Sequence, residues 1–176
     1  MKDAFRHGAA ARALAALVIV LLLGVIFNAD GAFFKLGTHR DALRQASVYG
    51  ILACGMTLVI ISGGIDLAVG SVLALVAVFV SKMTIWWGWS PWLSVPTALA
   101  AGALCGLASG LLVVYPRLQP FIATLAMMVF ARGMAKTLSG GVKVATAVPQ
   151  PDGSFEFVDV PAVFRSIDSR VFGDNL

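Results

Sequence analysis

The stretch from Thr57 to Ser71, TLVIISGGIDLAVGS, decides the fold because it places a carboxylate and three glycines inside an apolar run. Asp66 is the only charged residue between Gln45 and Ser81. Glycine readily adopts backbone conformations that end a helix. The long apolar run is therefore expected to break here, and the presence of Asp66 at the break needs a physical explanation.

The composition of the whole chain indicates an integral membrane protein. Of its 176 residues, 59% are hydrophobic and only 12% are charged, and the mean hydropathy is +0.90. Soluble domains carry about 25% charged residues. The net charge of +4 comes from Lys and Arg scattered between apolar runs. This pattern is typical of residues that flank membrane spans, so we expect contact with lipid and none with nucleic acid.

Apolar runs predict an all-α fold, a polytopic transmembrane helix bundle with about five membrane segments. The first run is interpreted as an uncleaved helix, because no convincing small-x-small cleavage site follows it before Asp30 and more apolar runs come later. A polar connector, Asp30–Arg44, leads to the second run, which is long enough to cross a hydrocarbon core of about 30 Å. The predicted segments are Ala13–Ala29, Gln45–Ile65, Leu67–Ser81, Pro91–Tyr115 and Phe121–Leu138. Trp86–Trp89 (WWGW) marks a membrane interface.

The composition changes after Gly141. Residues 142–176 contain prolines, charges and short alternating pieces, which predicts an extramembrane C-terminal loop with a small hairpin at PDGS, residues 151–154. With the basic N-terminus inside, five crossings place this loop outside the cell membrane. Residues 1–141 are then the transmembrane domain.

Small residues predict close helix packing. Gly102, Gly106 and Gly110 recur every fourth position and lie on one helix face, where another backbone can approach. Ala46, Gly50 and Cys54 repeat this spacing in the second segment. Both patterns favour a bundle over independent anchors.

Metal binding is not expected. The two cysteines, Cys54 and Cys105, lie inside apolar runs and are interpreted as packed small side chains. His7 and His39 are isolated near segment ends. The sequence therefore predicts no metal site and no cofactor.

The break admits two interpretations from chemistry alone. A charged aspartate at the bilayer centre costs at least about 2.5 kcal/mol, so Asp66 must lie near an interface, face a wet cavity or meet a donor. Gly63, Gly64 and Gly70 permit non-helical backbone, which membranes tolerate where it lines a cavity, as in transport pathways. Alternatively, Asp66 caps the second helix of a tight turn. A capped break can also border a pathway.

Two motifs carry a family resemblance. GMTLVIISGGIDLAVGSVLAL, from Gly55 to Leu75, closely resembles the signature of membrane permeases of bacterial sugar ABC importers of the ribose, xylose and galactose type. QPFIATLAMMVFARGMAKTLSGG, residues 119–141, is similar to a second motif of the same family. The resemblance covers most of residues 45–141. Three positions depart mildly from the family pattern: Ala68, Gln119 and Ala126.

The resemblance implies the pore-forming permease subunit of an ATP-driven sugar importer in the bacterial cytoplasmic (inner) membrane. Its implied partners are an ATP-binding subunit, a periplasmic sugar-binding protein, and a second permease copy or a complementary C-terminal half. The chain is expected to be the N-terminal half of a longer permease, with 142–176 as a truncated periplasmic loop. It contains no G-x-x-x-x-G-K-[ST] loop and no catalytic constellation, so we expect no enzyme activity of its own.

Candidate pathway or gate residues come from the two motifs: Thr57, Gly63, Gly64, Asp66, Gly70, Phe121 and Thr124. For Phe121 and Thr124 the alternative is helix packing with a local hydrogen bond to the residue four positions earlier. Two other functions stay open. One is an ion-coupled secondary transporter in which Asp66 titrates, and the other is a non-transporting membrane fragment.

Overall fold

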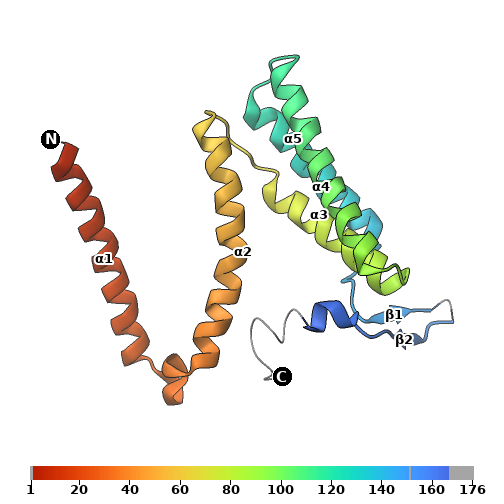
Figure 1. The fold of residues 1–176 in the computed structure, drawn as a ribbon, viewed down its shortest axis with the longest axis horizontal. Helices are drawn as coiled ribbons and strands as arrows, with labels where there is room; N and C mark the ends of the chain where they lie inside the picture. The colour runs from red at the N-terminus through yellow and green to blue at the C-terminus, as the bar shows by residue number, and fades with distance from the viewer. Residues whose placement is uncertain (1, 151, 167–176) are drawn as a thin grey trace. The chain divides into compact units, whose positions relative to one another are not determined.

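The computed structural model describes residues 2–150 and 152–166, and most of them are helical (Figure 1). The contacts within the chain divide it into two units, Met1–Ile51 and Leu52–Leu176. The elements in chain order are the helices α1 (Lys2–Ile26), η1 (Ala29–Phe34), α2 (Leu36–Ile61), α3 (Val69–Ser81), the π-helical turn η2 (Lys82–Trp86), α4 (Pro91–Val114) and α5 (Pro120–Ser139), then the strands β1 (Ala147–Pro149) and β2 (Phe155–Phe157). The predicted all-α polytopic architecture is confirmed.

Four of the described helices are long and apolar enough to cross a membrane. They are α2, α3 continued through η2, α4 and α5. The remaining predicted segment corresponds to α1, whose apolar portion, Ala10–Ile26, is shorter. The predicted count of about five segments thus consists of four long helices and this shorter one.

Two predicted boundaries were wrong. Most of the polar connector is helical, because α2 begins at Leu36 and nothing between Gly37 and Arg44 forbids a helix. The chain changes direction only at Asp30 and Gly31, where φ is 47° and 79°. The third segment also continues past Ser81 through η2, because the Lys82 amine donates to the Leu138 carbonyl and lies 4.8 Å from the ring centroid of Trp86. Lys82, the first residue after the predicted end of the span, is therefore held by specific partners within the helical segment.

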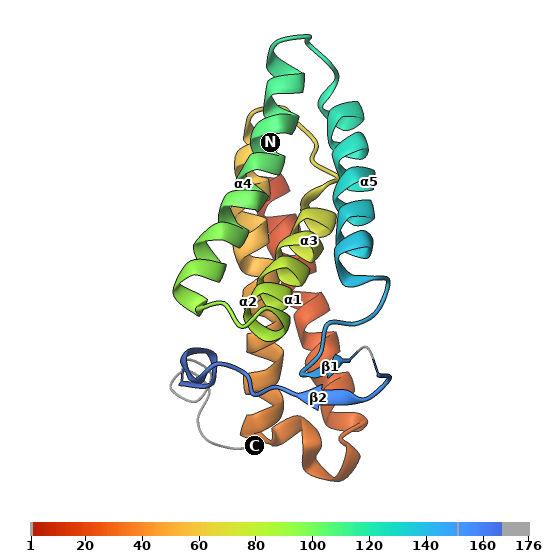
Figure 2. The ribbon, with the colours of Figure 1, turned by 90° about the vertical axis from the view of Figure 1, so that its right-hand side faces the viewer.

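Three helices of the second unit pack together. α3 contacts both α4 and α5, and Figure 2 shows these helices side by side. Their buried centre is built from small and medium side chains, Leu75, Cys105, Ala131 and Ala135. Cys105 is therefore packed as expected. Cys54 is exposed, because α2 contributes no buried residue.

A hairpin follows α5, as predicted. β1 and β2 pair antiparallel, with Ala147 opposite Phe157. In the turn, Asp152 accepts hydrogen bonds from the backbone N–H and the hydroxyl of Ser154, at 2.9 and 2.6 Å. The Ser154 hydroxyl is the main reason that the pKa of Asp152 lies below its ordinary value. Pro151 lies outside the described residues.

The hairpin is also linked to α3. The Trp86 indole N–H donates to the Ala145 carbonyl at 3.4 Å. This bond attaches the segment before β1 to the end of the α3–η2 span, where the Trp residues mark the predicted interface.

His39 makes an aromatic contact near the start of α2. His39 packs edge-to-face against Phe33 at 5.6 Å between ring centroids. The side chain of His7 lies outside the described part. Among the described residues, no group of three His, Cys, Asp or Glu side chains could hold a metal ion.

Candidate functional site at the break between α2 and α3

Gly63 and Gly64 end α2 with a specific turn. Gly63 has φ +77°, in the left-handed region, and its N–H donates to the Ile60 carbonyl at 3.0 Å. The N–H of Gly64 donates to the Val59 carbonyl at 2.9 Å. These two bonds form a Schellman motif, which satisfies carbonyls that the helix end would otherwise leave unpaired. The two glycines are therefore used to stop a helix inside an apolar run.

Asp66 forms a turn just before the next helix. One oxygen of its carboxylate accepts the backbone N–H of Ala68 at 2.7 Å. Ala68 is buried, and its carbonyl accepts the N–H of Val72 at 2.9 Å, which is the first turn of α3. The predicted helix cap by Asp66 was wrong, because the N-cap position of α3 is Ala68 and no side chain caps this end; the Asp66 bond instead forms a turn just before the helix. The same carboxylate lines a groove.

Thr124 connects the break to α5. Its buried hydroxyl oxygen accepts the N–H of Leu67 at 3.2 Å and lies 3.2 Å from the Ile65 carbonyl oxygen and 2.9 Å from that of Pro120. A threonine hydroxyl has one proton, so it donates to one of these carbonyls at a time. The local bond to Pro120 was the expected alternative. The bonds to residues 65 and 67 hold the break against a helix that is distant in sequence.

A groove of 710 Å³ opens beside the break, between the break and α4. Gly64, Asp66 and Thr124 line it on the side of the break. The remaining lining is largely apolar and comes from α2, α3, α4 and α5, with Ser62 and Ser109 as additional hydroxyls. We call this space the break groove.

The three glycines of α4 all line the break groove but differ in contact. A Cβ added to Gly102 would lie 2.9 Å from a methyl carbon of Val76, so α3 and α4 approach closely at this point. A Cβ at Gly106 or Gly110 would meet no atom within 4 Å. Only the first position is occupied by a helix contact, and the other two leave the groove open.

Several predicted residues lie away from the break groove. The Thr57 hydroxyl is exposed and donates to the Ala53 carbonyl at 2.7 Å. Phe121 is 47% exposed and does not line the groove. Gly70, expected in non-helical backbone, lies in the first turn of α3, because the helix already begins at Val69. The structure therefore brings together Gly64, Asp66 and Thr124 from the candidate set.

Four apolar helices of spanning length, with a polar break beside a groove, are typical of a multi-pass membrane protein. Residues 40–173 match the family described as "Branched-chain amino acid transport system / permease component". The chain belongs to this family of permeases.

Curated relatives agree with this assignment. The galactofuranose transporter permease YtfT of Escherichia coli (strain K12) is 37% identical over 97% of this chain and 53% of the relative. The fructose import permease FrcC of Rhizobium meliloti is 42% identical over 70% of this chain and 34% of the relative. The ribose import permease RbsC of Escherichia coli (strain K12) is 38% identical over 74% and 40%. The resemblance to sugar permeases is confirmed.

The chain spans about half the length of the first of these relatives and less of the others. No solved structure matches it.

Proposed function

We propose that this chain forms part of the pore of an ATP-driven importer that moves a sugar across the bacterial cytoplasmic membrane. The observation that carries the proposal is the polar break, in which Asp66 and Thr124 border a groove beside non-helical backbone between two apolar helices. Such backbone is tolerated where it lines a cavity or is buried in protein. The curated relatives carry the names of sugar permeases, which supports a sugar as cargo.

The break groove has the properties that a neutral sugar needs. Its volume of 710 Å³ falls within the range of ligand sites, about 300–1,000 Å³. One Asp66 oxygen binds Ala68, and the other accepts no hydrogen bond from the described residues, so it is available to a sugar hydroxyl. Gly106 and Gly110 leave room opposite it. In this proposal Gly63, Gly64, Asp66 and Thr124 form the pathway wall.

Thr57, Gly70 and Phe121 remain proposed pathway or gate residues, although they lie outside the break groove. Thr57 and Phe121 are exposed on the second unit, where further permease helices would cover them. Gly70 faces a second groove.

The partners follow from the importer class. A separate ATP-binding subunit would hydrolyse ATP, and a periplasmic binding protein would deliver the sugar. A second permease copy or a complementary C-terminal half would complete the pore. Residues 1–141 would form the membrane domain, and residues 142–176 would lie in the periplasm.

The test is solvent access to the break groove during transport. In a background without Cys54 and Cys105, Gly106→Cys should react with an impermeant thiol reagent in the assembled importer, and the transported sugar should slow that reaction. Leu104→Cys is the matched control, because Leu104 is exposed on α4 but does not line the groove. If Gly106→Cys does not react while uptake continues, the break groove is not the pathway.

A further inference from the structure

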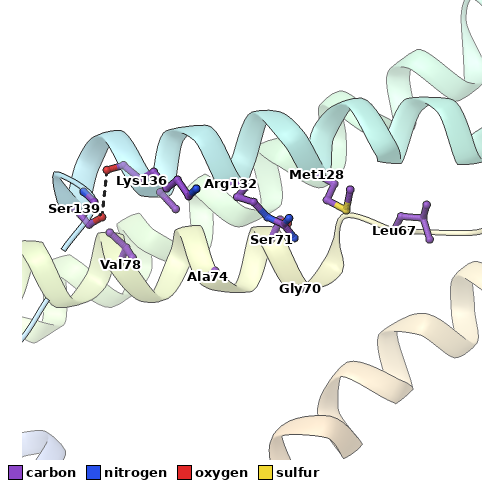
Figure 3. A pocket seen from close by; sticks show the side chains of 11 residues that line it. Leu67, Gly70, Ser71, Ala74, Val78, Met128, Arg132, Lys136 and Ser139 are labelled. Atoms are coloured by element: carbon purple, nitrogen blue, oxygen red, sulfur yellow. Dashed lines mark hydrogen bonds between the residues drawn. The ribbon is translucent and has the colours of Figure 1, made fainter. Parts of the chain in front are cut away.

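A second groove, of 340 Å³, lies between α3 and α5 (Figure 3). Gly70, Ala74 and Val78 line it from α3, whereas Val72 and Val76 line the break groove. At 100° per residue these two sets lie on opposite faces of α3. The second groove, which we call the α3–α5 groove, is thus separate from the site already described.

Three polar groups without partners meet in the α3–α5 groove. The Ser71 hydroxyl oxygen is buried, with the residue 5% exposed, and has no hydrogen-bond partner among the described residues. Figure 3 shows the Arg132 side chain extending from α5 toward Ser71. Lys136 lies one turn further along α5 and lines the same groove. No described residue forms an ion pair with either cation. Ser71 is buried, whereas Arg132 and Lys136 are exposed on α5. Buried polar groups are normally hydrogen-bonded, so the Ser71 hydroxyl requires an explanation.

The cluster lies away from both ends of α5, a helix long enough to cross a membrane. Along this helix Arg132 is about 18 Å from Pro120 and about 10 Å from Ser139, and its side chain leans toward the start of the helix. A lipid phosphate at the surface is therefore distant from Ser71.

An uncovered arrangement of this kind is unfavourable. An arginine inside the hydrocarbon core is unfavourable unless it meets a partner. Like charges four residues apart on a helix also repel each other. Both effects are relieved by an anion between Arg132, Lys136 and the Ser71 hydroxyl.

We propose that the α3–α5 groove is the docking site of another transmembrane helix, which carries a carboxylate at the level of Arg132. The proposal rests on the proposed function, in which this chain is part of a longer or split permease. The chain spans at most 53% of the relatives described, so the permease class contains further sequence that can supply the helix. α3, α4 and α5 contain no acidic residue, and Asp66 belongs to the break groove, so these helices of a second copy cannot supply the carboxylate.

The docking helix also explains the small residues on α3. Gly70 and Ala74 have small side chains and so leave room in the α3–α5 groove. A Cβ added to Gly70 would meet no atom within 4 Å. Small residues are typical of membrane helix interfaces, because they let a second backbone approach. Shape and charge therefore both favour a helix in this groove.

A photo-crosslinking amino acid at position 74 tests the proposal in membranes of the native host, with the other importer subunits present. The expected product joins this chain to a membrane-spanning peptide that contains Asp or Glu. Arg132→Gln should lower the yield about tenfold or more, because it removes a charged hydrogen-bond donor. Arg117→Gln is the control, since Arg117 lies in the loop between α4 and α5. A crosslinker at position 104 controls for general proximity.

A charge exchange makes the test specific. Arg132→Glu should abolish the crosslink, and replacing the mapped carboxylate with Arg should restore it. Crosslinks only to lipid, to a peptide without Asp or Glu, or to a second copy of residues 1–176 would overturn the proposal. An unchanged crosslink in Arg132→Gln would also overturn it. A crosslink that forms and is lost in Arg132→Gln, in an importer that shows no sugar uptake, would count against the proposed transport function and leave the docking site in place.

Discussion

The two grooves on either side of α3 use polar residues in opposite ways. In the break groove, Asp66 and Thr124 hold backbone groups of the chain itself, through bonds of 2.7 and 3.2 Å. In the α3–α5 groove, Ser71 and Arg132 have no partner among the described residues. A polar group whose hydrogen bonds are made within the chain fixes the local backbone. A polar group inside the membrane that has no such bond indicates that a neighbouring group is missing.

Replacing the carboxylate at the break should produce the largest effect. We expect Asp66→Leu to insert normally but to reduce sugar uptake to background in the assembled importer, because it removes both the acceptor for Ala68 and the free oxygen in the groove. Asp66→Asn keeps an acceptor oxygen and should retain measurable uptake. If Asn abolishes uptake as completely as Leu, a titrating carboxylate and the ion-coupled alternative are favoured. Normal uptake by Asp66→Leu would remove Asp66 from the pathway.

The turn that ends α2 should be the next most sensitive feature. Gly63→Val forces a β-branched residue to φ +77° and should destabilise the fold by about 1–3 kcal/mol. Thermal unfolding in detergent measures this change. Gly110→Ala is the control, because its added Cβ meets no atom within 4 Å and should shift stability by less than about 0.5 kcal/mol. Equal melting temperatures for the two variants would contradict the strained turn.

The Thr124 bond can be tested with a nearly isosteric change. Thr124→Val leaves the Leu67 N–H without its acceptor and should destabilise by about 1–3 kcal/mol. Thr137→Val is a matched control, since its exposed hydroxyl bonds only the Gly133 carbonyl in its own helix. Hydrogen exchange at residue 67 should accelerate in the first variant alone. Unchanged exchange would show that α5 does not hold the break.

The hairpin turn should give the smallest effect and a defined pH dependence. The pKa of Asp152 is lowered mainly by the Ser154 hydroxyl, so Ser154→Ala should raise it toward its ordinary value, as measured by NMR titration of the carboxyl. Because the folded pKa is depressed, this contribution to stability is present above the unfolded value and is lost as pH falls through the folded one. Ser47→Ala, which removes a hydroxyl in α2, should leave the titration unchanged.

The sequence predicted features that depend on local pattern. Apolar runs gave the spans, and the Gly63–Gly64–Asp66 cluster gave the break, because helix ends and turns are decided by neighbouring residues. The hydrogen bond from Leu67 to Thr124 joins residues 57 positions apart and depends on how α3 meets α5, so no local pattern contains it.

Errors arose where charge was interpreted as the end of an element. Arg40 and Arg44 suggested a connector, and Lys82 suggested the end of a span, yet all three lie in helical segments. Arg132 lies inside the predicted segment Phe121–Leu138. A charge within a predicted span is the available signal for the α3–α5 groove, and its proximity to Ser71 required the structure.

Thr124 attaches α5 to the start of α3, and Lys82 attaches the end of the α3–η2 segment to the carbonyl of Leu138. Two helices that are bonded to each other at both ends are expected to move as one rigid unit. The segment before the hairpin is bonded to the same end of this pair through Trp86. The left-handed turn at Gly63 precedes the pair, so we expect α3 and α5 to rotate together about this turn, beside Asp66.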